Sequence, residues 1–122
     1  MRAFVYEDAS GRHVVKISGA LEVTTAEAFL ATVEAVRGGS GGIAVQVDLS
    51  GVDFLDSSGI RALLRAHRAA VASGGSLTVS GARGLVAEVL RITAVGELLG
   101  MSAGDPSGDR PSVRDDGEPP PE

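Results

Sequence analysis

One stretch of the chain, residues 43–71, constrains the fold more than any other. Residues Ile43 to Leu49 are rich in β-branched side chains and alternate imperfectly, which predicts a buried strand. After the polar string Asp56-Ser57-Ser58-Gly59, apolar residues recur at helical spacing: Ile60, Leu63, Leu64 and Val71. We expect Ser57 to be the N-cap of this helix, because N-cap positions favour a hydroxyl. The helix then begins beyond the carboxyl end of a strand, where binding sites of open α/β sheets collect.

The remaining elements extend this unit in both directions. Residues 4–7 and 13–18 flank a polar turn and predict a β-hairpin. Thr24-Thr25-Ala26-Glu27 fits a capping box, so a helix is expected to start there and to stop at Gly38. The glycine-rich run 38–42 lacks the Lys-Ser/Thr of a phosphate-binding loop and is interpreted as a plain connector.

The C-terminal half predicts a short strand and a third helix. Ser76 to Ser80 is the strand, and residues 85–93 carry apolar side chains at helical spacing. Residues 95–101 stay ambiguous between helix and strand. The order β-β-α-β-α-β-α predicts an α/β fold with a small mixed sheet, in which an antiparallel N-terminal hairpin is followed by parallel βαβ units.

Composition excludes several classes of protein. The chain has no Cys, so it has neither a disulfide framework nor a thiolate metal site. No apolar run approaches the roughly 20 residues of a membrane span, and the N-terminus lacks a signal peptide's apolar region, so we expect a cytoplasmic protein without membrane contact. A net charge of −5 argues against direct nucleic-acid binding. His13 and His67 have no third ligand near them in sequence, so no metal site is expected.

The last twenty or so residues differ in composition from the rest. Residues 103–122 contain all five prolines, three glycines and six acids against two arginines. Such a segment cannot bury enough apolar surface to fold, so it is interpreted as a disordered acidic tail behind a single domain, residues 1–102.

Removing this tail is therefore expected to leave the domain intact. Truncation after Ser102 should change the Tm by less than about 3 °C, measured by thermal denaturation against the full chain. A larger drop would mean that the tail packs on the domain.

Two segments resemble the anti-sigma factor antagonist family, whose members are STAS domains. One is Asp56-Ser57-Ser58-Gly59 with the apolar strand before it and the apolar helix after it. The other is Gly19-Ala20-Leu21-Glu22, followed by Thr25-Ala26, in which Ala20 replaces the usual acid. Weaker similarity continues to about Met101. The resemblance implies a STAS-like sheet with its helices mainly on one face.

The resemblance also implies roles for the residues of the string. The serine directly after the aspartate is the family's phosphorylated residue, which corresponds to Ser57. Asp56 is either a turn residue, or a group that orients the Ser57 hydroxyl or contacts the partner. Ser58 is expected in the first helical turn and, with Asp56 and Gly59, is a candidate for partner binding. Gly59 indicates close approach of another backbone, either a partner's or that of a neighbouring strand.

Two further residues are candidates for partner binding. The resemblance places Glu22 in a loop beside the phosphorylated serine, although a solvated acid near a helix start is the simpler interpretation. Arg61 follows Ser57 by one helical turn and can pair with a phosphate on it. Alternatively, Arg61, Arg65 and Arg68 form one row of arginines along the helix, which is typical of a face in contact with solvent.

These residues predict a binding protein with no cofactor, and not an enzyme. By resemblance, the unphosphorylated form binds an anti-sigma factor that is also a serine kinase, phosphorylation at Ser57 releases it, and a phosphatase resets the switch. The alternative is a STAS-type regulatory subunit of a lipid-transport assembly.

Overall fold

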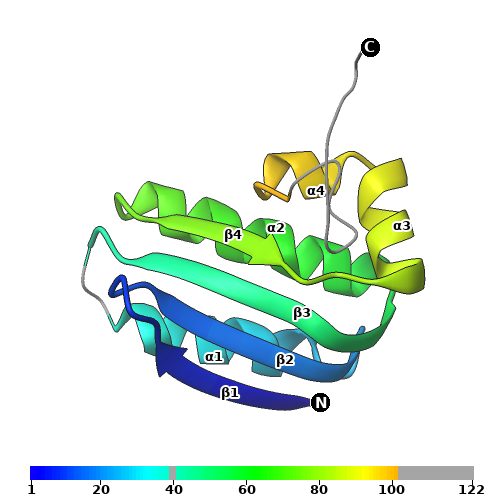
Figure 1. Ribbon diagram of the computed structural model, residues 1–122, viewed down its shortest axis with the longest axis horizontal. Helices are drawn as coiled ribbons and strands as arrows, with labels where there is room; N and C mark the ends of the chain where they lie inside the picture. Colours follow the sequence, from blue (N-terminus) through cyan, green and yellow to red (C-terminus); the bar gives the residue numbers. More distant parts are fainter. Residues whose placement is uncertain (39–40, 102–122) are drawn as a thin grey trace.

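The computed structural model describes residues 1–38 and 41–101, and these residues form a four-stranded mixed sheet with helices (Figure 1). The predicted tail, residues 103–122, lies outside the described residues. The elements, in chain order, are β1 (Arg2–Glu7), β2 (His13–Leu21), α1 (Ala26–Arg37), β3 (Ala44–Leu55), α2 (Ser57–Ala72), β4 (Ser76–Ser80), α3 (Gly84–Ile92) and α4 (Val95–Leu98).

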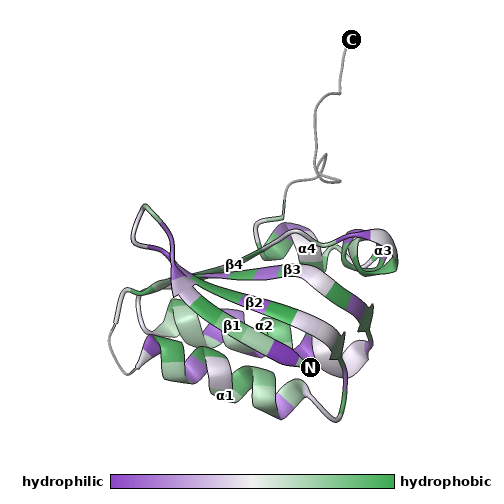
Figure 2. Ribbon diagram, turned by 60° about the horizontal axis from the view of Figure 1, so that its bottom comes forward, coloured by the Kyte–Doolittle hydropathy of each residue, from purple (hydrophilic) through white to green (hydrophobic). Residues whose placement is uncertain are grey.

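The strands lie in the sheet in the order in which they occur in the chain. Strand β1 pairs with β2 in antiparallel fashion, whereas β2 with β3 and β3 with β4 are parallel. The two parallel connections run through α1 and α2. Because such crossovers are right-handed and both step in the same direction, the two helices cover the same face of the sheet (Figure 2). The predicted mixed sheet and helix placement are confirmed.

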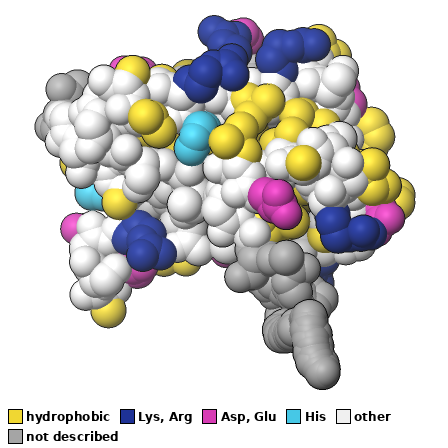
Figure 3. All heavy atoms as spheres, turned by 90° about the horizontal axis from the view of Figure 1, so that it is seen from above, with side chains coloured by type: hydrophobic (Ala, Val, Ile, Leu, Met, Phe, Trp, Pro, Cys, Tyr) yellow, Lys and Arg dark blue, Asp and Glu magenta, His cyan; other side chains and the backbone are white. Residues whose placement is uncertain are grey.

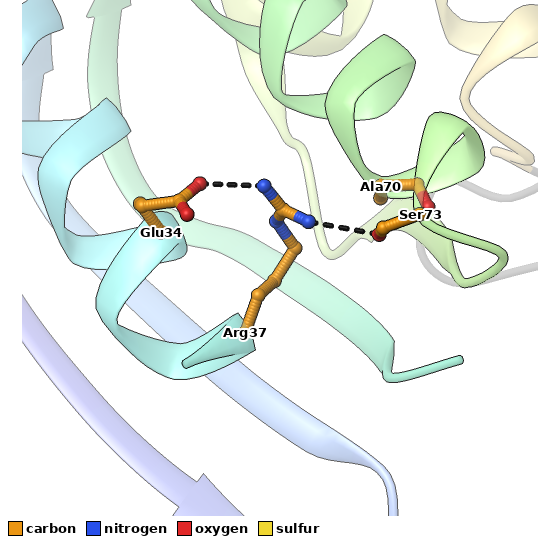
Figure 4. A network of polar contacts seen from close by, with 4 residues as sticks. All are labelled: Glu34, Arg37, Ala70 and Ser73. Carbon is orange, nitrogen blue, oxygen red and sulfur yellow. Dashed lines mark hydrogen bonds and ion pairs between the residues drawn. The ribbon is translucent and has the colours of Figure 1, made fainter. Parts of the chain in front are cut away.

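The core lies between this face and the two helices. Alternate side chains of β2, β3 and β4 point into it, and the core is aliphatic apart from one aromatic residue, Phe29 of α1. Fully buried members include Val15, Ile17, Leu21, Val45, Val47, Leu49, Leu63, Leu77 and Leu90. Arg37 joins the C-terminal ends of α1 and α2 (Figure 4). It donates to the Ser73 hydroxyl, at the end of α2, at 2.8 Å, and it contacts Glu34 of its own helix at 2.5 Å.

Strand β3 is longer than the sequence indicated. The predicted strand stopped at Leu49, but β3 continues to Leu55. Gly51 interrupts the alternation of apolar and polar residues by which a strand is predicted from sequence. Near this point the register of the β2–β3 pair also shifts, between Lys16 and Ser18. The longer strand continues by pairing with the end of β2, up to the pair Leu21 and Leu55.

The apolar face of α2 is also rotated relative to the prediction. Leu63 is fully buried as expected, but Val71 is 54% exposed. Small residues occupy much of the buried face: Gly59, Ala62, Ala66 and Ala70. They allow α2 to lie close to the sheet, and hydrophobicity alone did not reveal them because alanine is a weak core signal.

The C-terminal helices lie beside β4, at the edge of the sheet (Figure 1). The predicted third helix is confirmed as α3, and the ambiguous segment 95–101 forms the short helix α4 and not a strand. The backbone N–H of Val79 nevertheless donates to Leu99 O at 3.0 Å, which covers part of the β4 edge. Seen from this side, apolar side chains gather next to Lys and Arg side chains (Figure 3).

No helix within the described ranges is both long and apolar enough to cross a membrane.

Candidate functional site

The predicted site residues meet at the start of α2. Asp56, and not Ser57 as predicted, is the N-cap: its backbone is extended, and its Oδ1 accepts a hydrogen bond from Gly59 N at 3.0 Å. Ser57 is the first residue of the helix and is exposed. The correction follows from the longer β3, which brings Asp56 directly to the end of the strand. Because Asp56 already caps the helix, the Ser57 hydroxyl is not needed for capping.

Gly59 is buried where α2 meets β2. A Cβ at this position would lie 2.2 Å from Leu21 O and 2.7 Å from Leu55 Cδ1. Of the two interpretations of this glycine, the close approach of a neighbouring strand is therefore the one observed. Asp56 N also donates to Leu21 O, at 3.4 Å. The start of α2 is thus held against the end of β2.

Gly59→Ala is expected to destabilise the domain, contrary to the usual effect of alanine in a helix. Alanine is normally favoured over glycine in a helix by roughly 0.5–1 kcal/mol. Here the added methyl meets a backbone oxygen of a paired strand, so we expect a loss of about 1–3 kcal/mol of unfolding free energy in urea denaturation. The neighbouring Ser58→Ala is the control. Equal stabilities of the two variants would disprove the contact.

Glu22 lies in the loop that follows β2, beside this helix start. Thr24 donates to its carboxylate from the backbone at 3.1 Å and from the hydroxyl at 2.5 Å. These hydrogen bonds keep the pKa of Glu22 below its usual value, although the nearby negative charge of Asp56 acts in the opposite direction. Glu22 therefore carries its charge at neutral pH, close to Asp56.

The capping box predicted for α1 is wrong. Thr25 is the N-cap, but no side chain caps the helix. The Thr25 hydroxyl instead accepts from Glu22 N at 3.0 Å and donates to Ala20 O at 2.8 Å. Thr24 and Thr25 therefore both hold the Glu22 loop in place, a role that their spacing in the sequence did not indicate.

Ser58 and Arg61 line a groove between the starts of α1 and α2. Its volume is about 180 Å³, and Val23, Glu27 and Arg65 contribute to the same groove. Arg65 lies 3.8 Å from Glu27 across it. The Arg65 charge is thus partly balanced, whereas Arg61 forms no ion pair within residues 1–38 and 41–101.

Sequence patterns did not reveal two exposed apolar side chains, one in the loop before α1 and one shortly before α2. Val23, in the Glu22 loop, is 66% exposed, and Phe54, near the end of β3, is 53% exposed. An apolar residue inside an otherwise polar loop was the available signal for Val23. Phe54 belongs to the segment that carries the family resemblance, but its exposure depends on the pairing of β3 with β2.

The structure therefore brings Glu22, Asp56, Ser57, Ser58 and Arg61 to one end of the molecule, on two connected segments. Among the described residues, no three His, Asp or Glu side chains are grouped to hold a metal ion.

A mixed four-stranded sheet of this topology is the STAS fold. The chain belongs to this family: the family model described as "Mlab, STAS domain" matches residues 5–100. None of the curated proteins matches the sequence.

Solved structures show the same fold. An anti-sigma factor antagonist from Mycobacterium paratuberculosis is 28% identical, with a TM-score of 0.70, and the match covers 85% of this chain and 86% of that one. An anti-sigma-factor antagonist (STAS) domain protein from Planctomyces limnophilus is 22% identical, with a TM-score of 0.66 over 92% and 91% of the two chains. Murine Slc26a9, an anion transporter, is 25% identical, with a TM-score of 0.64, but the match covers 84% of this chain and only 16% of the transporter.

Proposed function

We propose that this protein is an anti-sigma factor antagonist that is controlled by phosphorylation of Ser57. The observation that carries the proposal is the position of Ser57, exposed as the first residue of α2 and next to a helix cap that does not need its hydroxyl. The likeness to the antagonist from Mycobacterium paratuberculosis over most of both chains supports it.

In this proposal the protein is a binding partner and a kinase substrate, and not an enzyme. The unphosphorylated helix start, with Glu22, Asp56, Ser58 and Arg61 around Ser57, docks on an anti-sigma factor with serine kinase activity. Val23 and Phe54 add apolar contact area beside these polar groups, as buried anchors do in protein interfaces. Gly59 contributes by keeping the helix start against β2.

Phosphorylation then acts on an interface that is already acidic. Glu22 and Asp56 lie near each other at this helix start, and a phosphate on Ser57 adds about −1.5 to −2 further charge at neutral pH. A partner surface that is complementary to the serine hydroxyl cannot accommodate a hydrated phosphate group in the same place. The kinase thereby releases its own partner, and a phosphatase restores binding, all within the cytoplasm.

Co-purification from the native cells tests the proposal. The tagged full chain should retain an anti-sigma factor of the kinase type, and phosphatase treatment of the lysate should increase the amount retained. The variant Ser57→Asp, handled in parallel, should retain little of it. Recovery of no such kinase with either sample would contradict the proposal.

A second candidate function is a regulatory subunit of a transport assembly, such as one for lipids. The observation that favours it is the occurrence of the same domain inside the anion transporter Slc26a9. In that case the same co-purification should recover transport components in place of an anti-sigma factor, and phosphatase treatment should leave the recovered amount unchanged.

A further inference from the structure

A polar hollow lies on the sheet face opposite α1 and α2. Its volume is about 330 Å³, and side chains of β3, β4 and the β1–β2 turn line it: Arg12, Gln46, Ser76, Thr78 and Ser80. Residues 76, 78 and 80 alternate with the buried Leu77 and Val79, so their hydroxyls share the outer face. Ser57 has no part in this hollow.

Hydrogen bonds across the hollow run in one direction. Arg12 Nη1 donates to Gln46 Oε1 at 2.8 Å, and Gln46 Nε2 donates to Ser80 Oγ at 2.6 Å. Because Ser80 Oγ acts as the acceptor in this chain, its own proton stays free for another group. Arg12 keeps further N–H donors as well. The hollow therefore offers several donors at once.

The charge of the lining residues fits an anion, and the acid Asp8 lies outside the lining, in the same turn as Arg12. Arg12 is the charged residue among those that line the hollow. The nearest acid on the same face of β3 is Asp48, whose Oδ1 accepts from Ser50 N at 2.9 Å. Asp48 pairs in register with Lys16 on β2 and with Ser80 on β4, so a cation lies on one side of its strand and a hydroxyl donor on the other. An acceptor in the hollow thus meets a guanidinium and hydroxyl donors.

From this arrangement we propose that the hollow binds a small oxyanion, a phosphate or a carboxylate, through Arg12 and the Ser80 and Thr78 hydroxyls. Arginine suits such ligands because its planar donors match two oxygens at once. The site is exposed to solvent, so we expect a dissociation constant on the order of 1 mM.

Two sources supply this chemistry. One is a free phosphate-bearing molecule. The other is an acidic side chain from residues 103–122, because Gly100 lines the hollow and this segment, with its six acids, follows shortly after in the chain.

The test is a titration of the full chain with inorganic phosphate, followed by amide NMR shifts at constant ionic strength with chloride as the reference salt. Saturable shifts should appear at residues 12, 46, 78 and 80. Arg12→Gln should weaken binding by roughly tenfold or more, and Ser80→Ala by less. Arg68→Gln, on the exposed face of α2, is the matched control and should bind normally.

Truncation after Ser102 separates the two sources. Tighter phosphate binding by the truncated chain than by the full chain would assign the hollow to the tail carboxylates, and equal binding would assign it to a free oxyanion. Shifts that do not saturate, or that are the same in Arg12→Gln and Arg68→Gln, would overturn the proposal.

Discussion

Ser57→Asp is expected to bind the proposed anti-sigma factor partner roughly 30- to several thousand-fold more weakly than Ser57→Ala. The reason is electrostatic: an unmatched charge at an interface costs on the order of 2–5 kcal/mol. The helix start tolerates the charge, because the first N–H groups of α2 and the positive end of its dipole lie beside residue 57. Both variants should therefore stay folded by circular dichroism, and binding titrations should measure the difference.

Phosphorylation itself provides the matched comparison. With the kinase and ATP, mass spectrometry should find phosphate on the parent chain and on Ser58→Ala, but not on Ser57→Ala. Ser58 lines the groove between the helices and is half-buried, whereas Ser57 is exposed. Phosphate on Ser58, or equal affinities of Ser57→Asp and Ser57→Ala, would contradict the assignment.

Leu63→Ala is expected to lower the unfolding free energy by roughly 2–5 kcal/mol, the usual cost of removing a fully buried leucine. Leu63 is 0% exposed and packs in the core between α2 and the sheet. Leu49→Ala, from β3, should have a similar effect because Leu49 is also 0% exposed. The measurement is chemical denaturation of each variant.

Val71→Ala in the same helix is the control for Leu63→Ala. Its side chain is 54% exposed, so we expect a change within about 0.5 kcal/mol. A large loss at Val71 with a small one at Leu63 would mean that the face of α2 observed here is wrong.

The sequence was sufficient to predict the order and type of most elements, because hydrophobic periodicity and the glycines that end helices are local signals. It was insufficient where pairing decides the outcome. The extension of β3 beyond Leu49 depends on the end of β2, and no local pattern carries that information. The end of β3 in turn determines that Asp56 caps α2, so a single error in strand length also misassigned the cap.

The candidate site was predictable to a similar extent. Family resemblance indicated the two segments that meet, and the structure brings them together. The contacts that shape the Glu22 loop were not predictable, since they are hydrogen bonds between the Thr25 hydroxyl and the backbone of Ala20 and Glu22. The exposure of Phe54 likewise depends on how β3 pairs with β2.

The sequential order of the strands has a consequence for how the domain folds. Every strand pairs only with its neighbours in the chain, so no pairing has to wait for a distant part of the polypeptide. The entropy of loop closure is then at most that of one helical crossover at each step. The hairpin β1–β2 can form first, and each later strand adds at the growing edge, in the order of synthesis.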